Sequence, residues 1–319
     1  MSNPLVYYHA DHDGLCAALI AWLSFGRTGE FKAVQYGMPA PLREVEGRDV
    51  YVLDFSWPRA DLLLMRERAR SLLVLDHHKT AKDDLKDLAF CVFDLDKAGA
   101  GLAWDVFGEE ACKLALGAEY NARDRLKHLV RYVQDRDLWL WNEPDSRAVN
   151  AFIRSHQMTL EKWDLAFVKQ DWFPSAAQRG ASILMAEDRL VEIFVKKSMH
   201  GSIVEHRGVL GHGMHGPQVS PVRVVNAPVL QSEVGHEILE QYPSVKAAVI
   251  FQYVRGEYVF SLRSRDDEVD VSRVAKARGG GGHPSAAGFS AKALLEADGG
   301  PIDLWDMDVW ETERKGEDK

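Results

Sequence analysis

Histidine and aspartate side chains that could bind metal ions follow three short apolar stretches of the sequence. They are His9, Asp11, Asp13, Asp54, Asp76, His77 and His78. The alternation of His9, Asp11 and Asp13 places these side chains on one face of an extended segment, because strand side chains have a period of two. Mixed imidazole and carboxylate ligands suit Mn²⁺, Fe²⁺ or Zn²⁺ better than Mg²⁺ or Ca²⁺. Asp54 could bridge two cations, and a pair of metal ions can activate water and stabilise the leaving oxygen in phosphoryl transfer.

Each of these patterns also has a simpler interpretation. The segment 9–14 could be a surface turn, and His77 and His78 could be solvated loop residues. An Asp-x-Asp pattern also occurs in calcium loops and in haloacid dehalogenase-type phosphatases, where the first aspartate is the nucleophile. The haloacid dehalogenase interpretation leaves the two histidines and a later glycine-rich segment unexplained, so a metal site is favoured.

The elements that carry these residues predict an α/β protein. Apolar runs at 5–8, 50–53 and 71–75 are short and bounded by polar residues, which is typical of strands buried on both faces. The runs 15–23 and 58–70 separate them and are expected to be helices. This alternation predicts an N-terminal doubly wound, mainly parallel sheet. In such sheets, ligands bind beyond the carboxyl ends of the strands.

The length of 319 residues favours more than one domain. We expect a catalytic domain over 1–175, a helical connector over 176–200 and a smaller mixed α/β domain over 201–310. The charged segment 311–319 is expected to be frayed. The smaller domain is inferred from short strand-like runs at 222–225, 245–253 and 257–262.

The composition excludes several classes of protein. The sequence has no run near the roughly 18 to 20 apolar residues of a membrane span and no signal-peptide pattern, so a cytoplasmic location without membrane contact is expected. The net charge of −9 argues against coating long nucleic-acid duplexes. A small anionic substrate remains compatible with it, because a bound cation inverts the local charge. Cys16, Cys91 and Cys112 are interpreted as small buried hydrophobic residues.

A glycine-rich segment, Gly-Gly-Gly-Gly-His-Pro-Ser-Ala-Ala-Gly-Phe, occupies positions 279–289. A bare glycine run is usually a flexible linker. This one follows a strand-like run that ends at Arg263 and precedes small apolar residues, so a tight loop whose backbone N–H groups face an anion is favoured. The segment matches neither the P-loop nor the dinucleotide-binding glycine pattern.

Taken in order, these motifs resemble the DHH phosphoesterase family. The resemblance rests on His-Ala-Asp-His-Asp-Gly at 9–14, Asp54, the Asp-His-His run at 76–78, the segment around Asp135 and the glycine-rich segment, and it spans about residues 5 to 290. The family includes RecJ-type exonucleases, nanoRNA and linear-dinucleotide phosphodiesterases, exopolyphosphatases and family II pyrophosphatases. Its members usually depend on Mn²⁺ and have the site in a cleft between two domains.

The resemblance implies two divalent cations, with Mn²⁺ expected first and Mg²⁺ or Co²⁺ as alternatives. Asp54 would bind both ions. The fourth motif of the family would supply Asp135, although Asp137 lies only two residues away and could substitute. The implied ligands are His9, Asp11 and Asp54 for one ion, and Asp13, Asp54, His77 and Asp135 for the other.

The resemblance also implies roles for residues that do not bind metal. His78 would contact phosphate and act as a general acid, and Asp76 would orient an imidazole by a hydrogen bond. Arg263 would stabilise the charge on the reacting phosphate. One departure is the turn Lys97-Ala98-Gly99-Ala100, where many members carry serine before Gly-Ala. The implied substrate contacts in the smaller domain are Arg263, Ser264, His283 and the N–H groups of Gly280, Gly281 and Gly282, with Asn226 and Ser232 as weaker candidates.

We therefore expect a metal-dependent phosphodiesterase that hydrolyses short oligonucleotides or linear dinucleotides to mononucleotides by in-line attack of water. A polyphosphate or pyrophosphate hydrolase is one alternative, and a nucleotide-binding regulator without turnover is another. The expected partner is a short nucleic acid or nucleotide, and a homodimer is compatible with the sequence. Trp139 and Trp141 could stack on a base or pack in the core or at a domain interface. His212 and His215 are expected to be loop residues.

Overall fold

The computed structural model describes residues 3–116, 122–205, 218–265, 269–291 and 302–307. The chain divides into two compact units, Met1–Ala186 (unit 1) and Glu187–Lys319 (unit 2), which are described separately. His212, His215 and the segment 311–319, for which predictions were made above, lie outside the described residues. None of the described helices is long and apolar enough to cross a membrane.

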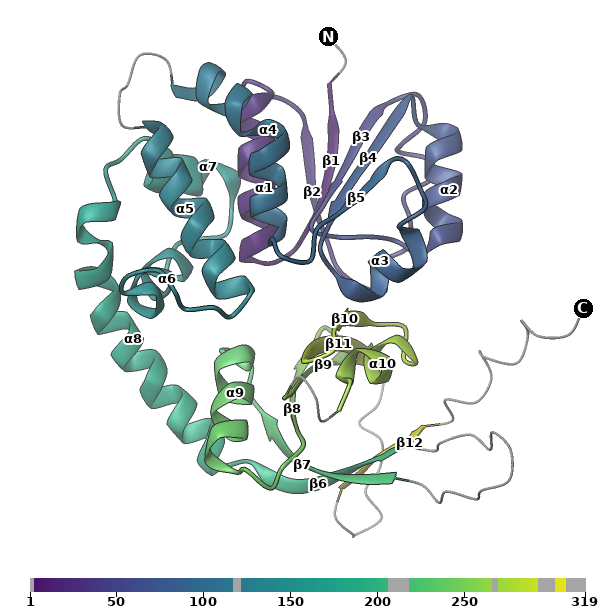
Figure 1. Cartoon of the computed structure of the whole chain (residues 1–319), viewed down its shortest axis with the longest axis vertical. Helices are drawn as coiled ribbons and strands as arrows, with labels where there is room; N and C mark the ends of the chain where they lie inside the picture. Colours follow the sequence, from purple (N-terminus) through teal and green to yellow (C-terminus); the bar gives the residue numbers. More distant parts are fainter. Residues whose placement is uncertain (1–2, 117–121, 206–217, 266–268, 292–301, 308–319) are drawn as a thin grey trace, which may run out of the picture. The chain divides into compact units, whose positions relative to one another are not determined.

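The described strands of unit 1 form a five-stranded, fully parallel sheet in the order β2-β1-β3-β4-β5 (Figure 1). The register pairs Tyr8 with Leu53 and Leu53 with Leu75, so β1, β3 and β4 end at the same edge. The residues that follow these strands are therefore neighbours. The strands are β1 Leu5–His9, β2 Glu30–Val34, β3 Asp49–Leu53, β4 Ser71–Asp76 and β5 Cys91–Phe93.

Helices cover both faces of this sheet (Figure 1). Val6 and Leu53 face the core shared with α1 His12–Ser24 and α4 Gly99–Leu116, whereas their neighbours Leu5 and Val52 face the other core. This alternation is the strand period of two, and it explains why the stretches 5–8 of β1 and 50–53 of β3 have no charged residue on either face. The predicted doubly wound fold class is confirmed. The remaining helices of unit 1 are α2 Arg59–Arg68, α3 Lys79–Leu85, α5 Ala122–Asp137, α6 Ser146–Arg154, α7 Leu160–Trp163 and the π-helix η1 Asp164–Val168.

The described residues of unit 2 form a seven-stranded mixed sheet in the order β10-β11-β9-β8-β7-β6-β12. Alternate residues of β8 face two separate cores. Val249 packs with the apolar residues of α10 Val271–Lys276, and Ile250 packs with those of α9 Gln231–Gln241. The strands are β6 Met199–Glu205, β7 Gln218–Asn226, β8 Ala247–Val254, β9 Glu257–Ser264, β10 Gly281–His283, β11 Ala286–Ala291 and β12 Ile302–Met307.

The division between the two units falls within α8 Phe173–Lys196, a helix of 24 residues. The expected domain boundaries and the role of 176–200 as a connector stay predictions. The three cysteines are free thiols, Cys16 buried and Cys91 and Cys112 half-buried. Burial raises the pKa of each thiol, so all three are expected to be protonated at neutral pH.

Candidate metal centre and active site

Asp54 occupies a strained turn directly after β3. Its φ of 56° is uncommon for a residue other than glycine, although aspartate tolerates this left-handed region better than most. Its backbone N–H donates to the carbonyl oxygen of Leu75 at 2.8 Å, which ties the turn to the end of β4. Asp54 is only 1% exposed. The turn therefore places its buried carboxylate beside the side chains that follow β1 and β4.

Two helix N-termini position Asp11 and Asp13. Asp11 is the N-cap of α1, and its Oδ1 accepts the backbone N–H of Gly14 at 2.9 Å. Asp13 accepts the backbone N–H groups of Gly99 and Ala100 at the start of α4. A Cβ at Gly14 would lie 2.2 Å from the carbonyl oxygen of His9, so only glycine allows this approach of α1 to β1. The positive helix ends favour the ionised carboxylates.

The turn that precedes α4 has Ala98 where the resembled family often has serine before Gly-Ala, and Lys97 comes just before it. The Lys97 Nζ pairs with Asp94 and Asp105, at 3.8 Å from Asp94 Oδ2 and 2.5 Å from Asp105 Oδ2. Contact between this turn and the cluster is made by the backbone of Gly99 and Ala100 instead. A lysine can therefore occupy position 97 without entering the cluster.

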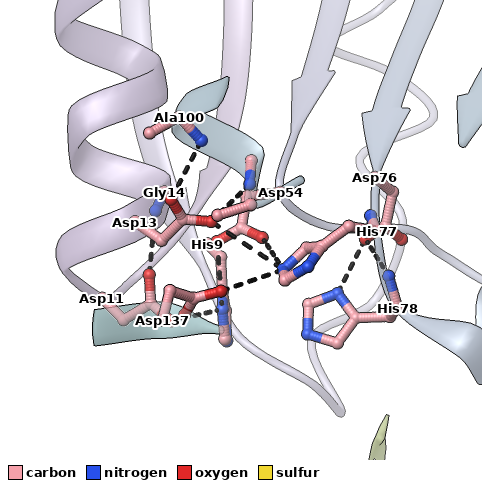
Figure 2. Close-up of polar contacts among 12 residues, drawn as sticks. His9, Asp11, Asp13, Gly14, Asp54, Asp76, His77, His78, Ala100 and Asp137 are labelled. Atoms are coloured by element: carbon pink, nitrogen blue, oxygen red, sulfur yellow. Dashed lines mark hydrogen bonds and ion pairs between the residues drawn. The ribbon is translucent and has the colours of Figure 1, made fainter. Parts of the chain in front are cut away.

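The Asp54 carboxylate lies between two groups of side chains (Figure 2). On one side, His9 Nδ1 is 2.9 Å from Asp11 Oδ2 and 3.7 Å from Asp54 Oδ2. On the other, His77 Nε2 is 3.1 Å from Asp54 Oδ1 and 3.8 Å from Asp13 Oδ2. The potential ligand atoms of His9, Asp11 and Asp54 lie within 4.8 Å of one another, and so do those of Asp13, Asp54 and His77.

The charges of these residues fit divalent cations. Asp13 and Asp54 are almost fully buried, and burial followed by repulsion from Asp54 raises the pKa of Asp13 well above its usual range. Burial also raises the pKa of Asp137 to about 6, against the attraction of His77. Asp54 Oδ1 is buried and accepts no hydrogen bond of normal geometry from the described residues. A bound cation would offset the carboxylate repulsion and could be coordinated by this oxygen.

The two imidazoles nearest Asp54 are strongly basic in this environment. Burial lowers the pKa of His77, but the contact with Asp54 and the charge of Asp137 outweigh it and raise that pKa to about 11. Burial likewise opposes the rise in the pKa of His9, which Asp11 and Asp54 bring well above its ordinary value. These groups attract positive charge, either a proton or a metal ion, so metal binding should release protons.

His78 is held by Asp76 through a hydrogen bond of 2.7 Å between His78 Nδ1 and Asp76 Oδ1 (Figure 2). Asp76 Oδ1 also accepts the backbone N–H groups of His77 and His78, and Asp76 Oδ2 accepts the hydroxyl of Ser56. Burial raises the pKa of Asp76, but attraction to His78 dominates and lowers it below its usual range. An ionised Asp76 therefore keeps a hydrogen on Nδ1 of His78 and fixes the orientation of its ring.

Of the two candidates for the fourth-motif ligand, Asp137 and not Asp135 lies beside His77. Asp137 Oδ2 lies 3.5 Å from His77 Nε2 (Figure 2), and the Asp137 side chain is 26% exposed. The buried Asp135 carboxylate instead accepts the backbone N–H groups of Asn142 and Glu143 and the hydroxyl of Ser146. Asp135 thus stabilises the loop between α5 and α6. The sequence left Asp137 as the alternative, and the geometry favours it.

Tyr36 is a neighbour of the cluster that sequence reasoning missed. Its ring centroid is 5.6 Å from that of His9 and 5.9 Å from that of His78, in both cases edge to face. Tyr36 follows β2, a strand that was not predicted, although this strand ends beside β1 like the others. A strand assignment at 30–34 would have marked the residues after it as candidates.

A small cavity of about 50 Å³ adjoins the carboxylates of the candidate metal centre in unit 1. It reaches the surface, and acidic and basic side chains both line it. The lining residues are Asp11, His12, Asp13, Val133, Arg136, Asp137, Asn150, Ile153 and Arg154.

Two predicted substrate contacts of unit 2 are engaged within that unit. Ser264 is buried, and its hydroxyl donates to the carbonyl oxygen of Val269 at 2.6 Å. The backbone N–H of Gly280 donates to the carbonyl oxygen of Ala275 at 2.9 Å and so does not face an anion. These two groups already have partners inside the fold, and their contact with substrate stays a prediction.

The rest of the glycine-rich segment forms a β-hairpin. Gly281 pairs with Gly288 and His283 with Ala286 in the antiparallel pair of β10 and β11. Gly282 has a φ of 138°, and a Cβ there would lie 2.5 Å from the carbonyl oxygen of Ala286, so the hairpin requires glycine.

Arg263 lies on β9, the neighbour of β11 in the sheet. Its guanidinium donates to Ser232 Oγ at 2.6 Å and to the carbonyl oxygen of Leu262 at 2.7 Å. Asn226 is the last residue of β7. Arg263, Gly281, Gly282 and His283 thus come together in unit 2, and their contact with substrate stays a prediction.

Fold and site geometry together are those expected of a phosphoesterase of the DHH type. The DHHA1 domain model matches residues 220–298, which contain the glycine-rich hairpin. With the Asp-His-His cluster of unit 1, this match supports the resemblance of the chain to the DHH phosphoesterase family.

Relatives of the chain cover most of its length. Protein R106 of Acanthamoeba polyphaga mimivirus, itself uncharacterized, is 23% identical over 309 residues, which are 91% of this chain and 68% of that protein. The oligoribonuclease NrnB of Bacillus subtilis is 22% identical over 305 residues, which are 89% of this chain and 72% of that protein. Among solved structures, the DHH domain of a member of a ribosomal protein family shares the fold, with a TM-score of 0.54, 14% identity and coverage of 90% and 82% of the two chains.

Proposed function

We propose that the protein is a phosphodiesterase that hydrolyses short oligonucleotides or linear dinucleotides to mononucleotides with the aid of two divalent cations, Mn²⁺ first. The observation that carries this proposal is the position of Asp54, whose carboxylate lies between two separate groups of potential ligands. The similarity to the oligoribonuclease NrnB supports a short nucleic acid as substrate.

His9, Asp11 and Asp54 would hold one cation, and Asp13, Asp54, His77 and Asp137 would hold the other. When bound, such ions lower the pKa of a coordinated water and stabilise charge on the phosphate. In the hydrolysis the oxygen of water bonds to phosphorus, and the bond from phosphorus to the leaving oxygen breaks. The residues of this chain orient the phosphate and move the protons.

His78 is the proposed proton donor to the leaving oxygen. The hydrogen bond to Asp76 holds Nδ1 of the ring, which leaves Nε2 to deliver the proton. We expect His78→Ala to keep its metal content and to lose about 10²- to 10⁴-fold in kcat, the usual contribution of general acid catalysis. Elemental analysis and steady-state kinetics separate the two effects, and loss of metal in this variant would contradict the assignment.

Arg263, His283 and the hairpin of unit 2 are the proposed contacts for the terminal phosphate of the substrate. Arg263 presents a guanidinium oriented by Ser232, a group suited to phosphate oxygens. Arg263→Lys should raise KM more than it lowers kcat if the residue serves binding. An unchanged KM would remove Arg263 from this role.

Product analysis tests the proposed substrate class. The purified protein would be stripped of metal, supplied with Mn²⁺ and offered a 5′-phosphorylated RNA dinucleotide and polyphosphate in parallel. We expect the protein to release mononucleotides from the dinucleotide and to release no phosphate from polyphosphate. Phosphate from polyphosphate alone would identify a phosphoanhydride hydrolase, and binding without hydrolysis of either would identify a nucleotide-binding regulator.

A further inference from the structure

The loop after Asp137 contains two tryptophans in an unusual backbone conformation. Trp139 and Trp141 have φ values of 56° and 55°, in the left-handed region that large aromatic residues rarely adopt. The loop lies between α5 and α6. Such conformations persist only where the surroundings determine them, and they concentrate at binding and catalytic sites.

Buried hydrogen bonds hold this loop in place. The Asp135 carboxylate accepts the backbone N–H of Asn142 at 2.8 Å and the hydroxyl of Ser146. The backbone N–H of Leu140 donates to the carbonyl oxygen of Asp135, also at 2.8 Å. Arg131 forms a two-pronged ion pair with Glu143. Together these contacts present the tryptophans on a rigid support.

The indole rings of Trp139 and Trp141 pack against each other. Their centroids are 4.9 Å apart and their planes are at 74°, an edge-to-face arrangement. Both residues are half-buried, and Leu140 between them is 51% exposed. The hydrophobic clusters formed by the described buried residues include neither ring, whereas they include Trp163 and Trp172. The pair thus lies outside the hydrophobic clusters of the described residues.

Along the chain, the two tryptophans are close to the cluster of potential metal ligands. Trp139 follows Asp137 by two residues, so their Cα atoms are at most about 7 Å apart. Asp137 Oδ2 in turn lies 3.5 Å from His77 Nε2. A nucleotide whose phosphate binds at the cluster would therefore have its base within reach of the indole rings.

We propose that Trp139 and Trp141 form a stacking site for a nucleobase of the substrate. The site would lie beside the strand-end cluster, the group formed by His9, Asp11, Asp13, Asp54, His77 and Asp137. This inference rests on the proposed function, because it assigns the base-binding part of that same site. Stacking on an aromatic face tolerates any base, so the pair would favour substrates with bases over those without and would not read sequence.

Leucine and phenylalanine variants separate stacking from packing. Trp139→Leu/Trp141→Leu keeps apolar volume but removes the aromatic faces, and Trp139→Phe/Trp141→Phe keeps them. With Mn²⁺, we expect the leucine variant to raise KM for the dinucleotide pApA by roughly 5- to 150-fold, the usual effect of losing a stacked base, with a smaller change in kcat. The phenylalanine variant should recover most of the affinity.

An abasic analogue of pApA with the same phosphates isolates the role of the base. The parent protein should prefer pApA, and the leucine variant should lose this preference. Trp22→Ala is the matched control, because Trp22 is also half-buried but lies about 15 Å along α1 from the end of the helix that carries Asp13. A preference for pApA that survives in the leucine variant would overturn the proposal.

Binding without turnover distinguishes this inference from the proposed function. In the parent protein supplied with Mn²⁺, the mononucleotide 5′-AMP should quench tryptophan fluorescence more than ribose 5-phosphate does, and the leucine variant should show no such difference. If the parent hydrolyses no oligonucleotide but keeps this response, the proposed function fails and the stacking site stands. If 5′-AMP and ribose 5-phosphate act alike on the parent, the stacking site fails.

Discussion

The strand-end cluster of unit 1 and the glycine-rich hairpin of unit 2 carry the two longest motifs of the chain, and they are built in opposite ways. In the cluster, buried carboxylates such as Asp13 and Asp54 repel one another and leave an oxygen without a hydrogen bond among the described residues. Beside the hairpin, Ser264 at the end of β9 and Gly280 just before β10 form hydrogen bonds to backbone carbonyl oxygens. The first motif is incomplete without a ligand, whereas the second largely completes itself.

This difference predicts which kind of effect a substitution should have in each region. Changes in the cluster should act on metal content and activity, because its side chains contribute little to the fold beyond their own supports. Changes at the hairpin glycines should act on stability, because the backbone itself fills the space that a side chain would need. The following variants test this contrast.

Asp54→Asn should have the largest effect. It removes the charge between the two ligand groups but keeps the shape and the tolerance of positive φ. We expect loss of bound Mn²⁺ and a fall in activity of roughly 10³-fold or more, since electrostatic stabilisation by the metal ions is lost. Elemental analysis and dinucleotide hydrolysis measure these effects, with the exposed Asp83→Asn as control. Metal retained at the parent level would contradict the central place of Asp54.

The pair Asp137→Asn and Asp135→Asn tests the revised ligand assignment. Asp137→Asn should weaken Mn²⁺ binding by about 10- to 100-fold or more, because it removes a carboxylate next to His77. Asp135→Asn should leave the affinity within a few-fold and lower the free energy of unfolding by about 1–3 kcal/mol, through its hydrogen bonds to the loop. Metal titration and chemical unfolding give both quantities. The reverse pattern would restore Asp135 as the ligand.

Gly282→Ala should affect stability without affecting metal. The added Cβ would meet the carbonyl oxygen of Ala286 at 2.5 Å, and φ is 138°. We expect a loss of about 1–3 kcal/mol in the free energy of unfolding. Ser290→Ala, at an exposed position of the same hairpin, serves as control and should be close to neutral. An unchanged stability in Gly282→Ala would show that the hairpin adapts more easily than its geometry implies.

The smallest expected effect is the pH dependence of the metal-free protein. Burial raises the pKa of Asp137 to about 6, so the folded state binds a proton that the unfolded state has lost between pH 4 and 6. Stability should therefore increase as pH falls through this window, by about 1–2 kcal/mol because the side chain is partly exposed. Thermal unfolding of metal-free parent and Asp137→Asn at pH 7 and pH 5 measures it. An equal increase in both proteins would assign the effect to other groups.

Much of the cluster could be predicted because its information is local. A buried strand shows itself as a short apolar run, and the residue after it must lie at the sheet edge, as Asp54 and His77 do. Parallel pairing then brings these edges together without further knowledge of the fold. The doubly wound class followed from the same alternation.

Other features depend on contacts that the local sequence does not encode. Asp135 and Asp137 both lie at the end of the same helix, and only the return of residues 142–146 to Asp135 distinguishes them. The strand β2 carries charged residues and was overlooked, and Tyr36 was overlooked with it. The glycine-rich segment 279–289 folds into a hairpin whose two strands pair with each other. The run of glycines alone does not reveal this pairing, so the sequence predicted a loop instead.

The strained turn at Asp54 limits what evolution could place there. Glycine and asparagine suit the left-handed backbone but bring no negative charge, whereas glutamate brings the charge but fits that backbone poorly. The space around Asp54 is also limited. A Cβ added at the neighbouring Gly99 would come within 2.4 Å of the Asp54 Cβ, so Gly99 has no room for a side chain either. Each replacement fails for a different physical reason, and the position is expected to be among the least mutable in the protein.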